Sequence, residues 1–337
     1  MKNIDVTINN FGKIQHAQFP LKPFTVIAGK NSSGKSFITR ALYGVFRSLN
    51  KEHFSSEMGQ VLSVADDAKI DIGDDMSQLL IDSTRIELSF QAQGIEDSQQ
   101  IENVVYLESP IYWKIKDVLK DWMSTQNDQS ESKQRKHQQK VLKNTPEYIL
   151  DIFALLNVDV IQDEVHEDLV KLKNTINKCI GGQIQISQSG DLQFYSQNKN
   201  GESFGVDLNQ TASGTTSLGL ISLLLEKNVI VPNSVLIMDE PEVNLHPAWQ
   251  QVMIQVLYQL SVAGVRIIMA SHSFDMMETI EKMMEQHEEK GLDVGEHFSV
   301  VQLDDGNTIN QDKPIFKKLD AVKADLGMPL YNLFADK

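Results

Sequence analysis

The segment Gly29–Ser36, with the sequence GKNSSGKS, constrains the fold of this chain more than any other. It fits the pattern G-x-x-x-x-G-K-[ST] without a mismatch. The apolar run Phe24–Ala28 before it predicts a buried strand, and residues 36–46 after it have a helical pattern. A glycine loop between a strand and a helix can cradle phosphate groups, so the sequence predicts a site for a nucleoside triphosphate.

Each residue type in this loop has a physical reason. Gly29 and Gly34 permit backbone conformations that a side chain would forbid, so successive N–H groups can converge on one phosphate. Lys35 is expected to reach the β- and γ-phosphates, and Ser36 to bind Mg²⁺. An ordinary glycine turn is the alternative, and the flanking strand and helix count against it. The other loop residues expected to contact the nucleotide are Asn31, Ser32 and Ser33.

The composition indicates the cellular setting. The chain has 337 residues, of which 41% are hydrophobic, enough for one large α/β domain or two smaller ones. Its single cysteine, Cys179, excludes an internal disulfide framework and fits a reducing compartment. The first residues, MKNID, contain no apolar signal core, and no apolar run approaches the ~20 residues that span a membrane. We therefore expect a cytoplasmic protein without a membrane partner.

The charge of the chain is unevenly distributed. The formal net charge is -15, which argues against a nucleic-acid footprint over the whole protein. A solvated helical face is the simplest explanation of a local basic run, and contact with DNA, RNA or an acidic protein is the alternative. This basic run follows an acidic segment of the chain. Its residues are Lys114, Lys116, Lys120, Lys133, Arg135, Lys136, Lys140 and Lys143.

The N-terminal part has the patterns of an antiparallel sheet. Apolar residues alternate over Ile4–Ile8 and Ile14–Phe19, with a hairpin turn expected at residues 9–12. Residues 50–82 are polar and acidic and predict a loop with short helices. Two further strands are predicted, at 85–91 and 101–107.

The rest of the chain predicts a helical block followed by α/β alternation. Helical spacing extends from Pro110 to about Ile180, and a β-hairpin is expected over 183–196. Alternating buried strands and helices then predict a mainly parallel sheet. We expect one α/β domain over 1–337, with an antiparallel N-terminal portion and a helical lobe at 109–182. The later predicted elements are a helix from Ser213, strands at 234–238, 265–270 and 300–303, and helices at 247–263, from 274, and at 313–326.

A second group of residues completes the predicted site. The apolar strand that ends in Asp239 and Glu240 presents two carboxylates at its carboxyl end. Asp239 would hold Mg²⁺ through water, and Glu240 would orient and polarise the attacking water. A strand followed by an acidic helix cap is the alternative. The presence of a phosphate loop in the same chain favours the catalytic interpretation.

The segment 239–247, DEPEVNLHP, resembles the Walker B motif and D-loop of ABC-type ATPases, in the form of their RecF-, SMC- and OLD-like branch. Residues 8–14 and 23–31 resemble the same branch. The likeness covers both ends of the chain and is weakest over 50–180. It implies an ABC-type P-loop fold that binds ATP and Mg²⁺ and hydrolyses ATP to ADP and phosphate.

The resemblance also implies roles for residues outside the two Walker motifs. His272, in ASHS at the end of an apolar strand, would be the switch histidine that senses the γ-phosphate. Residues 211–216, TASGTT, resemble the ABC signature, in which Ser213 and Gly214 would contact ATP. Thr215 replaces the second glycine of the transporter form, and a Ser/Gly helix cap is the alternative. Glu108 would take the place of the glutamine that couples to the helical lobe.

The family resemblance further implies an assembly. In these ATPases the signature faces the phosphate loop of a second subunit, so ATP would be held between two protomers. The expected form is a homodimer, or a higher even oligomer, that closes on ATP and opens after hydrolysis. Lys35, Glu240 and His272 would be the catalytic residues of each half.

The biological role is expected to depend on another protein. The residues beyond His272 are too few for a nuclease domain of ~100 residues or more. The likeness extends to stand-alone AAA-family ATPase subunits of bacterial anti-phage systems such as the Septu type, which implies a separate nuclease or toxin effector. A RecF-like DNA-repair or DNA-binding ATPase is the alternative. A transporter subunit is disfavoured by the form of the D-loop, and an inactive scaffold by the intact Walker residues.

Overall fold

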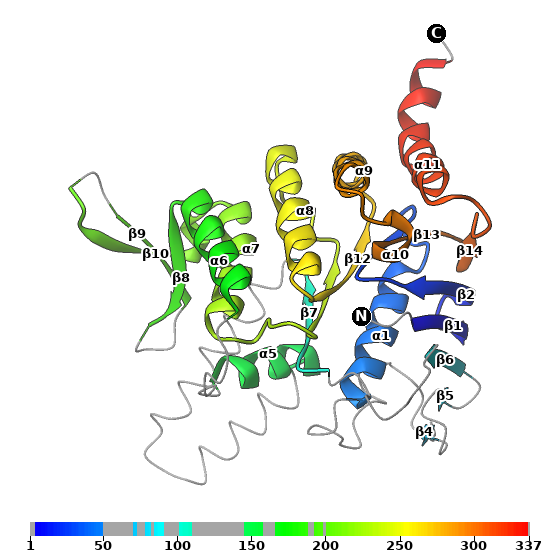
Figure 1. Ribbon diagram of the computed structural model, residues 1–337, viewed down its shortest axis with the longest axis horizontal. Coiled ribbons are helices and arrows are strands. Elements are labelled where there is room, and N and C mark those ends of the chain that lie inside the picture. The colour runs from blue at the N-terminus through cyan, green and yellow to red at the C-terminus, as the bar shows by residue number, and fades with distance from the viewer. Residues whose placement is uncertain are drawn as a thin grey trace. The chain divides into compact units, whose positions relative to one another are not determined.

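The computed structural model of the protein is shown in Figure 1. It describes residues 4–49, 70–72, 78–81, 84–90, 101–109, 145–157, 166–187, 192–197 and 200–335. The chain divides into two compact units. The first comprises Met1–Leu107, Pro232–Glu242 and Pro247–Lys337, and the second comprises Glu108–Val231 and Val243–His246.

The first unit begins with the predicted antiparallel hairpin. Strands β1 (Ile4–Phe11) and β2 (Ile14–Leu21) pair antiparallel, with Ile4 opposite Leu21. Both are longer than predicted, so the turn contracts to residues 12 and 13. Alternate residues of β1 are buried, as the sequence pattern requires for a strand with one face against a core.

Three further strands extend this antiparallel portion. β6 (Thr84–Phe90) pairs with β1, and β5 (Gln78–Ile81) and β4 (Ile70–Ile72) follow outward. The prediction of a loop with short helices is therefore wrong at 70–72 and 78–81. These stretches are too short to signal strands on their own, and the pairing of β5 with β6 and of β4 with β5 stabilises them as strands. The rest of 50–82 lies outside the described residues.

The central part of the same sheet is parallel, as predicted. β3 (Phe24–Ala28) is buried at every residue and lies between β12 (Arg266–Ser271) and β13 (Phe298–Asp304), parallel to both. β11 (Val235–Asp239) pairs parallel with β12. Among the described residues, the sheet is completed by β14 (Asn307–Ile309), which was not predicted, and by β7 (Val104–Glu108). The α/β fold with its mainly parallel core and antiparallel N-terminal portion is confirmed.

The strand register decides where the functional side chains meet. Asp239 pairs with Ala270, and Ala270 pairs with Ile27. The carboxyl ends of β11, β12 and β3 therefore lie at one edge of the sheet. Ligands bind at such an edge in open α/β sheets, because the loops that leave the strands converge there.

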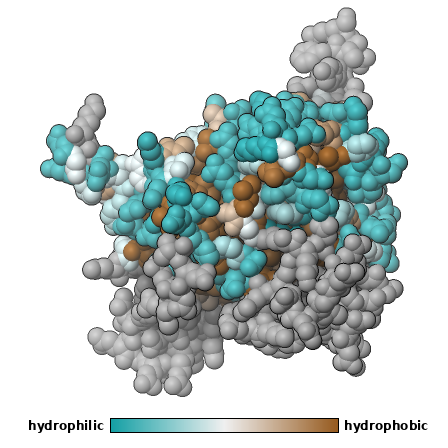
Figure 2. All heavy atoms as spheres, viewed as in Figure 1, coloured by the Kyte–Doolittle hydropathy of each residue, from teal (hydrophilic) through white to brown (hydrophobic). Residues whose placement is uncertain are grey.

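Helices cover both faces of this sheet. α1 (Lys35–Leu49) lies on one face, and α8 (Pro247–Val262), α9 (Phe274–Glu289) and α11 (Ile315–Ala335) lie on the other (Figure 1). This arrangement follows from right-handed crossovers that run in opposite directions along the sheet. α9 presents hydrophilic residues on the face shown in Figure 2, while its methionines Met276, Met277, Met283 and Met284 are buried. No described helix is both long and apolar enough to cross a membrane.

The second unit contains the described part of the predicted helical block. It has helices α5 (Glu147–Asn157), α6 (Glu167–Ile180) and α7 (Ser213–Glu226), and a sheet of β8 (Gly182–Ile186), β9 (Leu192–Gln197) and β10 (Ser203–Asp207). β8 and β9 form the expected antiparallel pair. The third strand, β10, was missed because it is largely exposed and has no apolar alternation.

Several predictions lie outside the described residues or stay untested. The helical pattern over 110–144 is one of the former, and so is the basic run from Lys114 to Lys143. The described chain contains one cysteine, Cys179, which is free and exposed. The single domain over 1–337 and the lobe bounds at 109–182 stay predictions.

A cluster of aromatic and histidine rings lies where α9, α10 (Val294–His297) and β13 meet. Tyr258 Oη is 3.0 Å from Nδ1 of His287, and Ser261 Oγ is 2.9 Å from Nε2 of His297. The two imidazoles are 4.5 Å apart between ring centroids. Burial lowers the pKa of His297 from 6.5 to about 4, and the neighbouring His287 adds to this.

The fold should lose stability as the pH falls through this range. Between pH 6.5 and 4 the unfolded chain takes up a proton that folded His297 does not, so acid favours unfolding. The free energy of unfolding, measured with urea, should fall between pH 7 and pH 5. His297→Phe should make this fall smaller by about 1 kcal/mol, a figure lowered to allow for solvent screening. An equal loss in His297→Phe and in the unaltered protein would contradict this prediction.

Candidate nucleotide site

The phosphate loop has the predicted glycine backbone conformation at Gly34, whereas Gly29 does not have a positive φ. The loop connects β3 to α1, and Gly34 has a φ of +109°. A Cβ atom on Gly29 would lie 2.3 Å from the backbone oxygen of Leu303, so the close approach of β13 excludes any side chain there. Ser32 also has a positive φ, of +63°. Successive N–H groups in such a turn can form an anion-binding nest.

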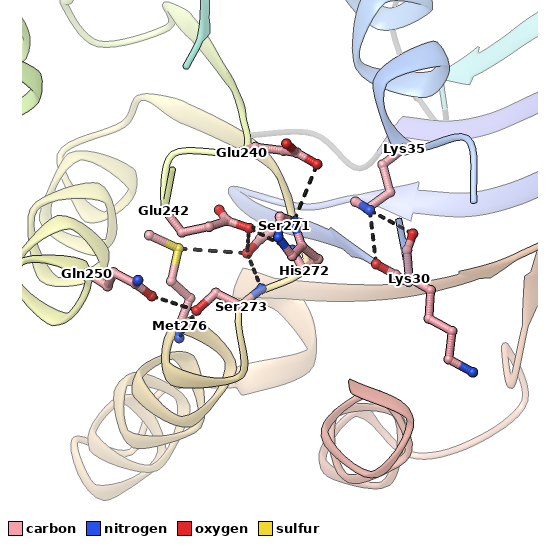
Figure 3. Close-up of polar contacts among 10 residues, drawn as sticks. Lys30, Lys35, Glu240, Glu242, Gln250, Ser271, His272, Ser273 and Met276 are labelled. Carbon is pink, nitrogen blue, oxygen red and sulfur yellow. Dashed lines mark hydrogen bonds and ion pairs between the residues drawn. The ribbon is translucent and has the colours of Figure 1, made fainter. Parts of the chain in front are cut away.

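Lys35 lies inside this loop. It is buried, and its Nζ atom donates to the carbonyl oxygens of Gly29 and Lys30, both at 2.9 Å (Figure 3). Burial lowers the pKa of Lys35, while the carboxylates of Glu240, Glu242 and Asp239 oppose this. Phosphate oxygens carry charge and would be stronger acceptors than these two carbonyls.

The loop is anchored from outside by two neighbouring turns and a helix. The N–H of Gly306 donates to the Ser33 carbonyl at 3.1 Å, and Lys13 Nζ donates to the Ser32 carbonyl. Lys30 points away from Lys35 and forms a 2.6 Å ion pair with Asp325 of α11. Asn31 and Ser32 are exposed, whereas Ser33 Oγ is buried without a hydrogen-bond partner among the described residues.

Asp239 ends β11 as a buried carboxylate. Its Oδ2 atom accepts from the Tyr106 hydroxyl at 3.0 Å, and Ser36 also hydrogen bonds to this carboxylate. Its Oδ1 atom is buried and has no partner within the described part of the chain. Burial raises the pKa of Asp239, and the hydrogen bonds from Ser36 and Tyr106 oppose the rise.

These residues fit a Mg²⁺ ion bound together with a nucleotide. An unpartnered buried carboxylate oxygen beside a serine hydroxyl offers two hard oxygen ligands. Mg²⁺ in nucleotide sites takes few protein ligands and completes its shell with water and phosphate oxygens. No group of three or more His, Cys, Asp or Glu residues that could hold a metal occurs in the described ranges. The residues that would hold the ion are Ser36 and Asp239.

Glu240 and His272 lie side by side at the same sheet edge. Glu240 has a φ of +51°, and its N–H donates to the Ala270 carbonyl at 2.9 Å. Its Oε1 atom is 3.3 Å from Nδ1 of His272, which follows β12 directly (Figure 3). A glutamate in the left-handed region is strained, and such strain is concentrated at functional sites. No pattern in the residues around Glu240 indicates this strain.

Two residues of the site were missed by the sequence analysis. Tyr106 of β7 supports Asp239 and has a raised pKa, mainly through burial. Glu242 is buried and contacts the loop that carries His272. The presence of a tyrosine within the otherwise aliphatic run Val104–Leu107 was a sequence signal that Tyr106 has a special role. Glu242, the second missed residue, ends the DEPE segment 239–242, in which only Asp239 and Glu240 were assigned roles.

The predicted signature and the Glu108 position belong to the second unit. Ser213 is the first residue of α7, and its N-cap is Ala212, which makes no side-chain cap. The helix-cap alternative is therefore wrong for Ser213, whose Oγ donates instead to the carbonyl of Asn244. Gly214 is buried, and Ser213 is exposed. Glu108 is buried and accepts a hydrogen bond from the Tyr148 hydroxyl of α5.

Comparison with protein families identifies the chain. A family model described as "AAA domain, putative AbiEii toxin, Type IV TA system" matches residues 24–275, which include the phosphate loop, Asp239, Glu240 and His272. The chain belongs to this AAA-domain family. It is thus an ATPase-type P-loop protein. Among curated proteins, none matches this chain.

Solved structures with related folds are ATP-binding cassettes and SMC heads. The ATP-binding cassette MJ1267 of an ABC transporter is 15% identical with a TM-score of 0.44, over 96% of each chain. An Smc head domain derived from Pyrococcus furiosus is 13% identical with a TM-score of 0.43, over 86% of this AAA-domain protein and 100% of that chain. The SMC head domain from Thermotoga maritima is 14% identical with a TM-score of 0.41, over 83% and 92%.

Proposed function

We propose that this AAA-domain protein is a Mg²⁺-dependent ATPase that converts ATP and water to ADP and phosphate. The observation that carries the proposal is the meeting of five predicted residues within one unit. Ser36 hydrogen bonds to Asp239, Lys35 lies within electrostatic reach of Asp239 and Glu240, and Glu240 lies beside His272. Lysine, hydroxyl, carboxylates and imidazole at the end of a phosphate loop suit phosphoryl transfer to water.

Each residue has a defined task in this reaction. Lys35 binds the β- and γ-phosphates and neutralises charge on them. Glu240 orients a water molecule and accepts its proton as the water oxygen attacks the terminal phosphorus, while the bond from that phosphorus to the ADP oxygen breaks. His272 donates a hydrogen bond to the terminal phosphate. Bound Mg²⁺, held by Ser36 and Asp239, would offset charge on the phosphate oxygens.

We further propose that two protomers enclose ATP, with Ser213 and Gly214 of one completing the site of the other. The exposed Ser213 at the start of the 14-residue helix α7 supports this, because a helix N-terminus favours phosphate. In light scattering after size exclusion, Glu240→Gln with ATP and Mg²⁺ should give a dimer. A mass that does not depend on ATP would argue against ATP-driven assembly.

Mixing two inactive variants tests whether the signature acts in trans. Lys35→Ala and Ser213→Trp should each be nearly inactive alone. A mixed dimer would have one site with both changes and one with neither, so an equal mixture should recover about a quarter of the full activity. Ser213 is exposed, so tryptophan there should leave the fold intact. A mixture no more active than its components would contradict a shared site.

We also propose that this ATPase acts in the cytoplasm on a separate nuclease or toxin effector, in bacterial anti-phage defence. The family description, which names a toxin and a type IV toxin–antitoxin system, supports a two-component arrangement. Cells carrying the native operon should resist some members of a phage panel, and Lys35→Ala should abolish this resistance. If cells with Lys35→Ala resist phage as well as cells with the unaltered operon do, the defence role does not depend on nucleotide binding by this protein.

A further inference from the structure

Glu242 makes a set of contacts that the ATPase reaction does not yet explain. Its Oε1 atom accepts the backbone N–H of His272 at 2.7 Å and the hydroxyl of Ser271 at 2.9 Å. The same oxygen is 3.2 Å from Nδ1 of His272. Figure 3 shows the Glu242 side chain reaching from the end of β11 to the loop after β12. One carboxylate oxygen thus accepts the backbone N–H of His272 and lies close to its imidazole.

The remaining contacts make this loop a single polar network. Ser271 Oγ also accepts the N–H of Ser273 at 3.1 Å, and Ser273 Oγ donates to Gln250 of α8 at 2.5 Å. Glu242 supplies the carboxylate of this network, and its side chain is only 6% exposed. Burial raises the pKa of Glu242, and the hydrogen bonds from His272 and Ser271 oppose the rise. Its other oxygen, Oε2, is buried without a hydrogen-bond partner in the described ranges.

A purely structural role does not account for a carboxylate at this position. A buried carboxylate with one oxygen unpartnered costs stability, and a neutral amide could accept the same two hydrogen bonds at lower cost. A carboxylate at this position can act on the neighbouring imidazole of His272, which an amide would not attract in the same way. Nδ1 of His272 lies between two carboxylates, at 3.2 Å from Glu242 and 3.3 Å from Glu240, although neither contact is directed as a hydrogen bond.

We propose that Glu242 is a positioning residue for ATP hydrolysis, which fixes the loop after β12 and keeps a proton on Nδ1 of His272. This inference rests on the ATPase function proposed above. With the Nδ1 edge facing the two carboxylates, Nε2 is the nitrogen left to contact a bound phosphate, to which it can donate only when the ring carries a proton on each nitrogen. Glu242 thereby sets the direction of the imidazole, while Glu240 remains the residue that accepts the proton of water.

A double-mutant cycle tests whether Glu242 acts through His272. Glu242→Gln should lower kcat by about 10- to 100-fold, the usual effect of losing a group that orients a functional histidine, with KM for ATP nearly unchanged. The double variant with His272→Ala should be no slower than His272→Ala alone, because both changes remove one function. Ser271→Ala is the matched control, since it removes a neutral donor and leaves the charge. An unchanged kcat, or losses that multiply in the double variant, would overturn the proposal.

Nitrogen-15 NMR of the histidine side chains provides a second test, which does not require a substitution of Glu242. The ring signals of His272 are identified by their loss in His272→Ala. In the unaltered protein, the Nδ1 shift should be that of a protonated nitrogen. An unprotonated Nδ1 would overturn the proposal, because its lone pair would then face two carboxylates.

The two proposals fail in different ways. If the unaltered protein has no ATPase activity above that of Lys35→Ala, the proposed function fails, and the NMR result still judges the role of Glu242. If Lys35→Ala and Glu240→Gln are inactive but Glu242→Gln retains full kcat, only the positioning role fails.

Discussion

Glu240→Gln is expected to slow ATP hydrolysis by on the order of 10²–10⁴-fold, the contribution of a positioned acid–base group. The amide has nearly the shape of the carboxylate but cannot accept the proton of the attacking water. Glu240 lies half-buried at the end of β11, 3.3 Å from His272, with a strained backbone held by the Ala270 carbonyl. Glutamine can adopt the same conformation, so ATP binding should persist. Phosphate release under single-turnover conditions measures the effect.

A second glutamate provides the control for this substitution. Glu278 of α9 is 41% exposed and forms an ion pair at 3.3 Å with Lys323 of α11. Glu278→Gln should change turnover by less than about threefold, as exposed ion pairs contribute little. If Glu240→Gln hydrolyses ATP as fast as this control does, Glu240 is not the base.

Lys35→Ala is expected to weaken ATP binding by on the order of 10- to 100-fold, as hydrogen bonds to charged groups contribute about 1.5–3 kcal/mol. The buried ammonium is held inside the loop by two carbonyls, from which it can turn to phosphate oxygens. Burial lowers the pKa of Lys35, so its removal should not greatly destabilise the protein without nucleotide. Isothermal titration gives the Kd, and the loss of the ATP-induced rise in Tm provides an independent measurement.

The same loop contains a matched control lysine. Lys30 is 55% exposed, and its side chain pairs with Asp325 rather than with the interior of the loop. Lys30→Ala should therefore bind ATP within about threefold of the unaltered protein. Equal losses in the two variants would mean that general positive charge, rather than the position of Lys35, determines affinity.

Strands whose conformation follows from their own sequence were predicted correctly, and strands that depend on a partner strand were missed. β3, β11 and β12 were predicted within one residue at either end, because a fully apolar run of strand length between turn signals is a local property. β4, β5, β10 and β14 were missed, because each is short and owes its conformation to a partner strand. α11 extends to Ala335, well beyond the predicted end at 326.

The sequence alone determined the phosphate loop and the acidic strand end, since their residues are neighbours along the chain and their spacing fixes the chemistry. Only the tertiary structure decided which distant residues support them. The parallel register of β11, β12 and β3 brings Asp239 beside Ser36 and Glu240 beside His272. The same register places Glu242 against the loop after β12, while β7, the neighbour of β11 in the sheet, gives Tyr106 its contact with Asp239. These contacts join residues that lie from 30 positions apart, for Glu242 and His272, to 203 positions apart, for Ser36 and Asp239 (239 − 36), and spacing along the chain carries no signal for such pairs.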